Sequence, residues 1–153
     1  MIKISSEEEL LSSFRDIDRD QVQIPPDFKF PLPVRDYTSW VEASGHRVYL
    51  IFENQSTGHP MGVVFRRPNG PPMTPASMCQ WCHTVRTGNA VTLLTAATSE
   101  NRRIGLYLCS RLNCREHALT SPSIHDFNEG LSGQERINEV VRRMRDFATG
   151  NLF

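Results

Sequence analysis

The chain has little of what marks a secreted, membrane-spanning or strongly charged protein. No apolar run approaches the roughly 18 residues that a membrane-spanning helix needs. The start, Met-Ile-Lys-Ile-Ser-Ser-Glu-Glu-Glu, lacks the apolar stretch of a secretory signal, so we expect a cytoplasmic protein with no membrane partner. Seventeen Lys and Arg residues balance seventeen Asp and Glu residues, and no overall field draws the chain to nucleic acid.

Catalytic motifs are missing as well. The sequence has no His-Glu-x-x-His motif, no Gly-x-Ser-x-Gly motif and no glycine-rich phosphate loop. Its five histidines include no helical i,i+4 pair and have no carboxylate at a fixed spacing. We therefore predict that the protein is not an enzyme.

The composition is otherwise typical of a globular protein. The 153 residues are 39% hydrophobic and 22% charged, which is enough for one domain with one modest core. We predict an N-terminal helix and proline-rich segment over residues 1–34, followed by a zinc-finger domain over 35–153, together forming a monomer. The fold class predicted is α+β, with a small antiparallel sheet, a four-cysteine treble-clef zinc finger and a C-terminal amphipathic helix.

The local patterns behind this fold are clear. Capping boxes at Ser6 and Ser132 open apolar runs of helical period, which predict helices over 6–17 and 133–148, the latter ended by Gly150. Four prolines within 24–33 predict an extended segment anchored by Phe28, Phe30 and Leu32. Two pairs of β-rich runs, at 48–52 with 61–65 and at 91–97 with 104–108, predict two antiparallel hairpins.

The four cysteines are the most informative residues. Cys79 and Cys82 form one pair with two residues between them, and Cys109 and Cys114 form a second with four residues between them. In a chain expected in a reducing compartment, such pairs indicate metal ligands before disulfides. A knuckle, a hairpin and then a helix carrying the second pair is the order of a treble-clef finger. Unligated or redox-active thiols remain the alternative.

Zinc suits this donor set because four thiolates can surround it tetrahedrally. Four sulfurs close the coordination shell, whereas a catalytic zinc keeps an open position, so we predict a structural Zn²⁺. Four thiolates would leave the site with a net charge of −2, which Arg86, Arg111 and Arg115 could offset.

Several residues near the cysteines are candidates for binding a partner. Trp81 lies between the first two ligands and is either a core residue beneath the knuckle or an exposed aromatic anchor. Arg102 and Arg103 at the tip of the second hairpin are either solvated or a docking contact. Residues 79–120 carry a net charge of +3, so an alternative function is binding of nucleic acid such as ribosomal RNA, or another regulatory interaction.

Three features of the sequence occur together: the run Cys79 to His83, the hairpin after it, and Gly105-Leu106-Tyr107-Leu108-Cys109 followed by Cys114. Together they resemble the C-terminal zinc-finger domain of elongation-factor-G-binding proteins of the fusidic-acid-resistance type. The likeness covers roughly residues 35–153. It implies a bacterial cytoplasmic protein that binds elongation factor G and helps to free it from the ribosome, without binding or modifying the antibiotic. It also implies that the four cysteines hold zinc and that Gln80, Trp81, Arg102 and Arg103 face the partner. Arg86 is a further partner-binding candidate beside the first pair.

Overall fold

A computed structural model describes residues 2–70, 75–120 and 132–153. Its centre is a five-stranded antiparallel sheet in the order β3-β4-β5-β8-β9. The strands are β3 (Tyr37–Val41), β4 (Arg47–Asn54), β5 (His59–Arg66), β8 (Val91–Ser99) and β9 (Arg102–Cys109). Two short ribbons pair β1 (Ile2–Ile4) with β2 (Leu32–Val34) and β6 (Ser77–Met78) with β7 (Val85–Arg86). The helices are α1 (Glu7–Ser12), α2 (Asp16–Arg19), α3 (Cys114–Leu119) and α4 (Gly133–Asn151).

Both predicted hairpins are confirmed, and each is longer than its β-rich core. In β4–β5 the paired register runs from Arg47 opposite Arg66 to Asn54 opposite His59. In β8–β9 it runs from Val91 opposite Cys109 to Ser99 opposite Arg102, with an irregularity between Ala97 and Ser99. The second hairpin therefore delivers Cys109 at the end of its last strand. The α+β class is confirmed.

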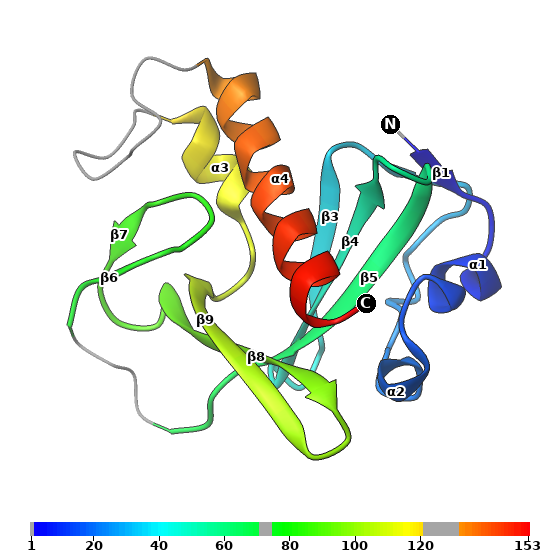
Figure 1. The fold of residues 1–153 in the computed structure, drawn as a ribbon, viewed down its shortest axis with the longest axis horizontal. Coiled ribbons are helices and arrows are strands. Elements are labelled where there is room, and N and C mark those ends of the chain that lie inside the picture. Colours follow the sequence, from blue (N-terminus) through cyan, green and yellow to red (C-terminus); the bar gives the residue numbers. More distant parts are fainter. Residues whose placement is uncertain (1, 71–74, 121–131) are drawn as a thin grey trace.

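The sheet buries its two faces against different partners. One face packs against α4 and the cysteine region through a large cluster that includes Leu50, Phe65, Leu94, Leu108 and Met144. On the opposite face, residues from the N-terminal segment cover β3, β4 and β5 and form a second cluster, which includes Leu10, Phe14, Trp40, Tyr49 and Val64. Figure 1 shows α4 between the β6–β7 ribbon and strands β3–β5, with α1 and α2 beyond those strands.

The first helix is shorter than predicted. Ser6 caps it by accepting a hydrogen bond from the Glu9 N–H at 3.2 Å, but α1 ends at Ser12 rather than at residue 17. Phe14 leaves the helix because its backbone bridges to Gly62 of β5. A Cβ at position 62 would lie 2.7 Å from the Phe14 ring, so glycine there makes room for the aromatic side chain.

The C-terminal helix is longer than predicted. It begins at the expected capping box, Ser132 with Glu135, but continues past Gly150 to Asn151. The Leu152 N–H donates to the Ala148 carbonyl, and the Leu152 side chain packs against the main cluster. A glycine inside a helix costs about 1 kcal/mol relative to alanine, and this packing outweighs that cost.

Hydrogen bonds from Arg15, one member of a buried ion pair, link the N-terminal segment to the rest of the chain. Arg15 contacts the Asp18 carboxylate at 2.7 Å, and the same guanidinium donates to the carbonyls of Ala97 in β8 and Leu152 after α4. Phe28, Phe30 and Leu32 of the proline-rich segment pack against the second cluster as predicted. The division of the chain at residue 34 stays a prediction. No helix among the residues described has the length and apolar content to cross a membrane.

Candidate metal centre

The four cysteines converge from two separate parts of the fold. Cys79 and Cys82 come from the turn between β6 and β7, Cys109 ends β9, and Cys114 opens α3. Their four sulfur atoms all lie within 4.8 Å of one another. Cys79, Cys109 and Cys114 are fully buried, whereas Cys82 is half-buried. The convergence that the spacing predicts is therefore present.

The distances between sulfurs fit a tetrahedral zinc. Cys79 Sγ lies 3.8 Å from Cys114 Sγ, and Cys82 Sγ lies 3.6 Å from Cys109 Sγ. A tetrahedron with zinc–sulfur bonds of about 2.3 Å has edges of about 3.8 Å. A disulfide would bring two sulfurs to about 2.05 Å, and all four cysteines are free thiols. The donor set and its spacing are those of a structural zinc.

The electrostatics of the thiols also favour a cation at this centre. Hydrogen bonding to the Cys109 thiol lowers the pKa of Cys82, whereas contact with that same thiol and burial raise the pKa of Cys114. The cluster alone therefore cannot ionise all of its members. A divalent cation among them would stabilise every thiolate at once, which is the chemistry it supplies here.

Both cysteine pairs lie on tight turns with a non-glycine residue at positive φ. In the first turn, the His83 N–H donates to the Cys79 carbonyl at 2.9 Å, and His83 itself has φ 63°. In the second turn, the Leu112 N–H donates to the Cys109 carbonyl at 2.9 Å, and Leu112 has φ 51°. These turns bend the backbone so that both sulfurs of a pair face the same point.

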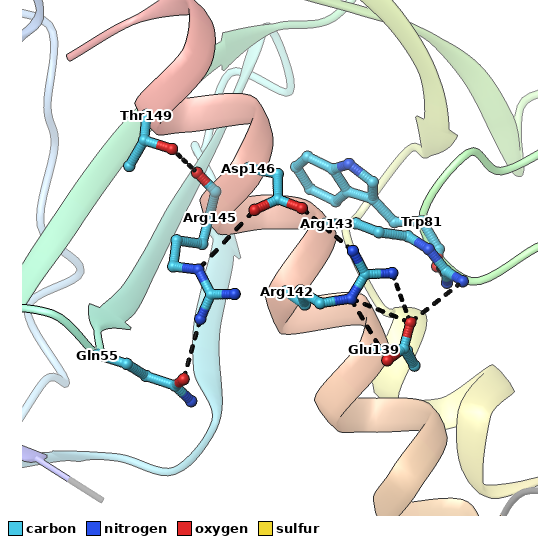
Figure 2. Close-up of polar contacts among 8 residues, drawn as sticks. All are labelled: Gln55, Trp81, Glu139, Arg142, Arg143, Arg145, Asp146 and Thr149. Atoms are coloured by element: carbon cyan, nitrogen blue, oxygen red, sulfur yellow. Dashed lines mark hydrogen bonds and ion pairs between the residues drawn. The ribbon is translucent and has the colours of Figure 1, made fainter.

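The first turn is held against β9 and α4. The Gln80 N–H donates to the Tyr107 carbonyl, and Gln80 Oε1 accepts from the Tyr107 N–H, both at 2.8 Å. From α4, Arg143 Nη1 donates to the Trp81 carbonyl at 2.6 Å. Figure 2 shows Arg143 reaching from the helix to Trp81, beside Glu139 and Arg142.

Trp81 is a core residue, so the prediction of an exposed anchor is wrong. Its side chain is 3% exposed, and its ring packs edge-on against Phe65 of β5 at 5.9 Å and Phe147 of α4 at 6.1 Å. The two residues between the ligands differ in burial. The Trp81 ring is buried, whereas Gln80 is bonded to Tyr107 of β9 and stays exposed. Trp81 thus joins the metal centre to the hydrophobic core.

Tyr37 of β3 joins the second turn to the sheet, a role that the sequence did not indicate. Its hydroxyl donates to the Leu112 carbonyl and accepts from the Arg115 N–H, both at 2.8 Å. Burial raises the pKa of Tyr37 far above its usual value, so this hydroxyl keeps its proton. The guanidinium of Arg115 lies 4.5 Å from the centre of the Tyr37 ring.

Of the three arginines expected to offset the charge of the thiolates, Arg115 is engaged elsewhere. Arg115 donates to the carbonyls of Arg35 and Tyr37, and Arg86 and Arg111 are exposed. His117 does contact the sulfurs: its Nδ1 lies 3.3 Å from Cys109 Sγ and 3.8 Å from Cys82 Sγ. His117 follows Cys114 by three residues in α3, and this one-turn spacing is the signal that could have identified it.

The remaining candidates for binding a partner differ in whether their side chains already form hydrogen bonds within the chain. Arg86 and Arg102 are exposed on β7 and β9. Arg103 is exposed too, but its guanidinium donates to the Thr95 hydroxyl at 3.0 Å and to the Thr95 carbonyl at 2.9 Å. Burial and the charge of Arg66 lower the pKa of Arg103.

Comparison with known proteins agrees with this geometry. A family model described as the FBP C-terminal treble-clef zinc-finger matches residues 9–150. Among solved structures, the fusidic acid resistance protein FusC is similar, with a TM-score of 0.49 and 17% sequence identity. That match covers 71% of this chain and 48% of the FusC chain, so the chain spans about half of FusC. No curated protein matches the chain.

Proposed function

Because the chain belongs to the FBP C-terminal treble-clef zinc-finger family, we propose that it is a cytoplasmic, non-enzymatic protein that binds elongation factor G and modulates its interaction with the ribosome. The observation that carries the proposal is the closed centre of four sulfurs in a chain of this family. Elongation factor G is proposed as the partner because the two cysteine turns and the second hairpin resemble those of elongation-factor-G-binding proteins.

A binding role suits the chemistry of the centre. Four thiolates complete the tetrahedral shell of a zinc ion and leave no position for a substrate or an activated water. The metal would therefore act by holding the β6–β7 turn, the end of β9 and the start of α3 in one rigid lobe. A rigid surface loses less conformational entropy when it binds a partner, which favours affinity.

The surface proposed for the partner lies on the outside of this lobe. Gln80, Arg86, Arg102 and Arg103 are all exposed. Among them, Arg86 and Arg102 make no side-chain hydrogen bond or ion pair with the part of the chain that the structure describes, so both guanidinium groups can meet carboxylates of a partner. Trp81 is excluded from this surface by its burial.

The experiment is a titration of the purified zinc-loaded protein with purified elongation factor G. We expect the wild type to bind, and the double variant Arg86→Ala/Arg102→Ala to bind several-fold more weakly. Lys29→Ala is the matched control, because it removes an exposed positive charge from the proline-rich segment far from the finger in the sequence. No binding by the wild type at tens of micromolar, which corresponds to roughly −6 kcal/mol, contradicts the proposal.

A further inference from the structure

A concentration of positive charge lies on the sheet away from the metal centre. A hollow of about 320 Å³, here called the arginine hollow, is lined by His46, Arg47, Arg66, Arg67 and Asn69. None of these residues is acidic. Fifteen of the seventeen basic residues in the chain are arginines, and their planar guanidinium groups match the geometry of an oxyanion such as phosphate.

The strand register is what concentrates this charge. Arg47 of β4 lies directly opposite Arg66 of β5, and like charges facing each other across a sheet reduce its stability. Arg47 is partly compensated by Glu42, whose carboxylate lies 3.1 Å from it, but its Nε is buried without a hydrogen-bond partner. The Arg66 side chain makes no hydrogen bond or ion pair with any residue described here. A bound anion would supply the missing compensation.

The donors of the other residues are partly free for a ligand. Arg67 uses one guanidinium nitrogen to donate to the Gly45 carbonyl at 3.1 Å, which fixes its stem. His46 uses Nδ1 in a contact of 3.1 Å with the Asn69 side chain, and its Nε2 has no partner among residues 2–70, 75–120 and 132–153. These contacts orient both side chains without exhausting their hydrogen-bonding capacity.

A second hollow of about 410 Å³ adjoins the first and shares Arg67 and Asn69 with it. This tyrosine hollow is lined on the β8–β9 side by Leu93 and Tyr107, whose side chains are 39% and 40% exposed. They lie directly opposite each other in the register, so they share one face of the sheet. An exposed aromatic ring with an aliphatic neighbour is a surface on which a nucleobase can stack.

We propose that the two hollows together bind a nucleotide, with its phosphate in the arginine hollow and its base against Tyr107. The nucleotide comes either from a single-stranded RNA or from a free mononucleotide, since both carry the same phosphate and base. Tyr107 belongs to the +3 region 79–120, and its backbone N–H donates to Gln80 of the surface proposed for elongation factor G. The arginine hollow shares no residue with that surface, so Arg66→Ala tests the nucleotide site separately from the proposed function.

The test is fluorescence anisotropy of a short labelled single-stranded RNA with the zinc-loaded chain over a series of salt concentrations. We expect Arg66→Ala to weaken binding by about ten-fold and to lower the slope of log affinity against log salt by about one. Arg66→Lys should restore part of the loss, and Tyr107→Ala should weaken binding with little change in slope. Arg142→Ala is the matched control, because it removes one exposed arginine from α4.

Two further ligands identify the source of the anion. If a mononucleotide competes as strongly per molecule as the RNA does, the natural ligand is a free nucleotide. If the mononucleotide competes much more weakly, the natural ligand is an RNA strand. Poly-glutamate that competes as well as RNA of equal charge overturns the proposal in favour of an acidic protein surface. The proposal is also overturned if neither nucleotide ligand binds, or if Arg142→Ala weakens binding as much as Arg66→Ala.

Discussion

The two faces of the central sheet are stabilised in different ways. On the finger side, three fully buried cysteines belong to the main hydrophobic cluster, and three of the four sulfurs come from very short elements, the β6–β7 ribbon and α3. On the N-terminal side, aromatic rings meet edge to face: Phe14 packs against Trp40 at 6.4 Å and against Tyr49 at 6.3 Å. One side combines a metal with a hydrophobic core, and the other relies on aromatic packing and buried ion pairs.

This difference follows from the length of the elements. The ribbon β6–β7 has two residues in each strand and α3 has six residues, which is too short for independent stability. Ligation supplies the order that hydrogen bonds alone do not provide. The N-terminal segment also has short helices, but it lies on β3–β5, in which β4 and β5 are paired along their full eight-residue length. The finger should therefore depend on metal, and the N-terminal cluster should not.

Removing the metal should have the largest effect. Structural zinc contributes an apparent binding free energy of roughly 10–16 kcal/mol in small fingers. Chelation, or Cys109→Ser, should therefore unfold the β6–β7 ribbon and α3 and greatly speed amide hydrogen exchange there. Exchange in β4 and β5 should stay slow, as hydrogen-exchange mass spectrometry can determine. Full zinc stoichiometry in Cys109→Ser, or equal loss of protection on both sides, would contradict the comparison.

Matched tryptophan variants compare the two clusters directly. Trp81→Ala and Trp40→Ala each remove a buried indole and should each lower the free energy of unfolding by about 3–5 kcal/mol. Trp81→Ala should also weaken zinc binding, because Trp81 lies between two ligands, whereas Trp40→Ala should leave zinc affinity unchanged. Denaturant unfolding and competition with a chromophoric chelator measure the two quantities. Equal zinc affinity in both variants would argue against coupling between the core and the metal centre.

Matched tyrosine variants should give a smaller effect. Tyr37→Phe removes the hydroxyl that links Leu112 to Arg115, and Tyr49→Phe removes one that lies within hydrogen-bond distance of the Gln21 carbonyl and the Glu42 carboxylate. Each should lower the free energy of unfolding by about 1–3 kcal/mol, because buried partners lose a hydrogen bond. Tyr37→Phe should also speed the release of zinc, which stopped-flow chelation can follow. An equal change in the release rate for Tyr49→Phe would remove the distinction between the two sides.

The smallest predicted effect depends on pH and is confined to the N-terminal side. Burial raises the pKa of Glu42, but hydrogen bonds from Ser44 and Tyr49 and the charge of Arg47 outweigh it, and the net shift is downward. A carboxyl whose pKa falls on folding stabilises the protein above its unfolded pKa, and this contribution is lost as pH falls through the folded pKa. The advantage of the wild type over Glu42→Gln, about 1 kcal/mol at neutral pH, should therefore shrink in acid. Urea unfolding of both proteins at several pH values measures it, and an advantage that grows in acid would contradict this sign.

Local patterns were enough to predict much of the fold and the metal ligands. Capping boxes, alternating apolar runs and cysteine spacing act over a few residues, so both hairpins, the start of α4 and the four sulfurs followed from the sequence. The ends of the helices did not follow, because tertiary contacts decide them. Phe14 leaves α1 for Gly62, and Leu152 extends α4 by packing on the core.

Contacts between distant segments could not be predicted. Trp81 is buried because Phe65 and Phe147 meet over the knuckle, and Tyr37 reaches the second turn from a strand more than seventy residues away in sequence. The arginine hollow depends on the β4–β5 register, which places Arg47 opposite Arg66. A linear charge count shows the pair Arg66-Arg67 but not that Arg47 lies opposite Arg66.

The central claim is that Cys79, Cys82, Cys109 and Cys114 bind one zinc ion between them. X-ray absorption at the zinc edge, together with metal analysis of the purified chain, tests it most directly. We expect one zinc per chain, surrounded by four sulfurs at about 2.3 Å. Zinc well below one per chain, or a shell in which a nitrogen such as that of His117 replaces a sulfur, would contradict it.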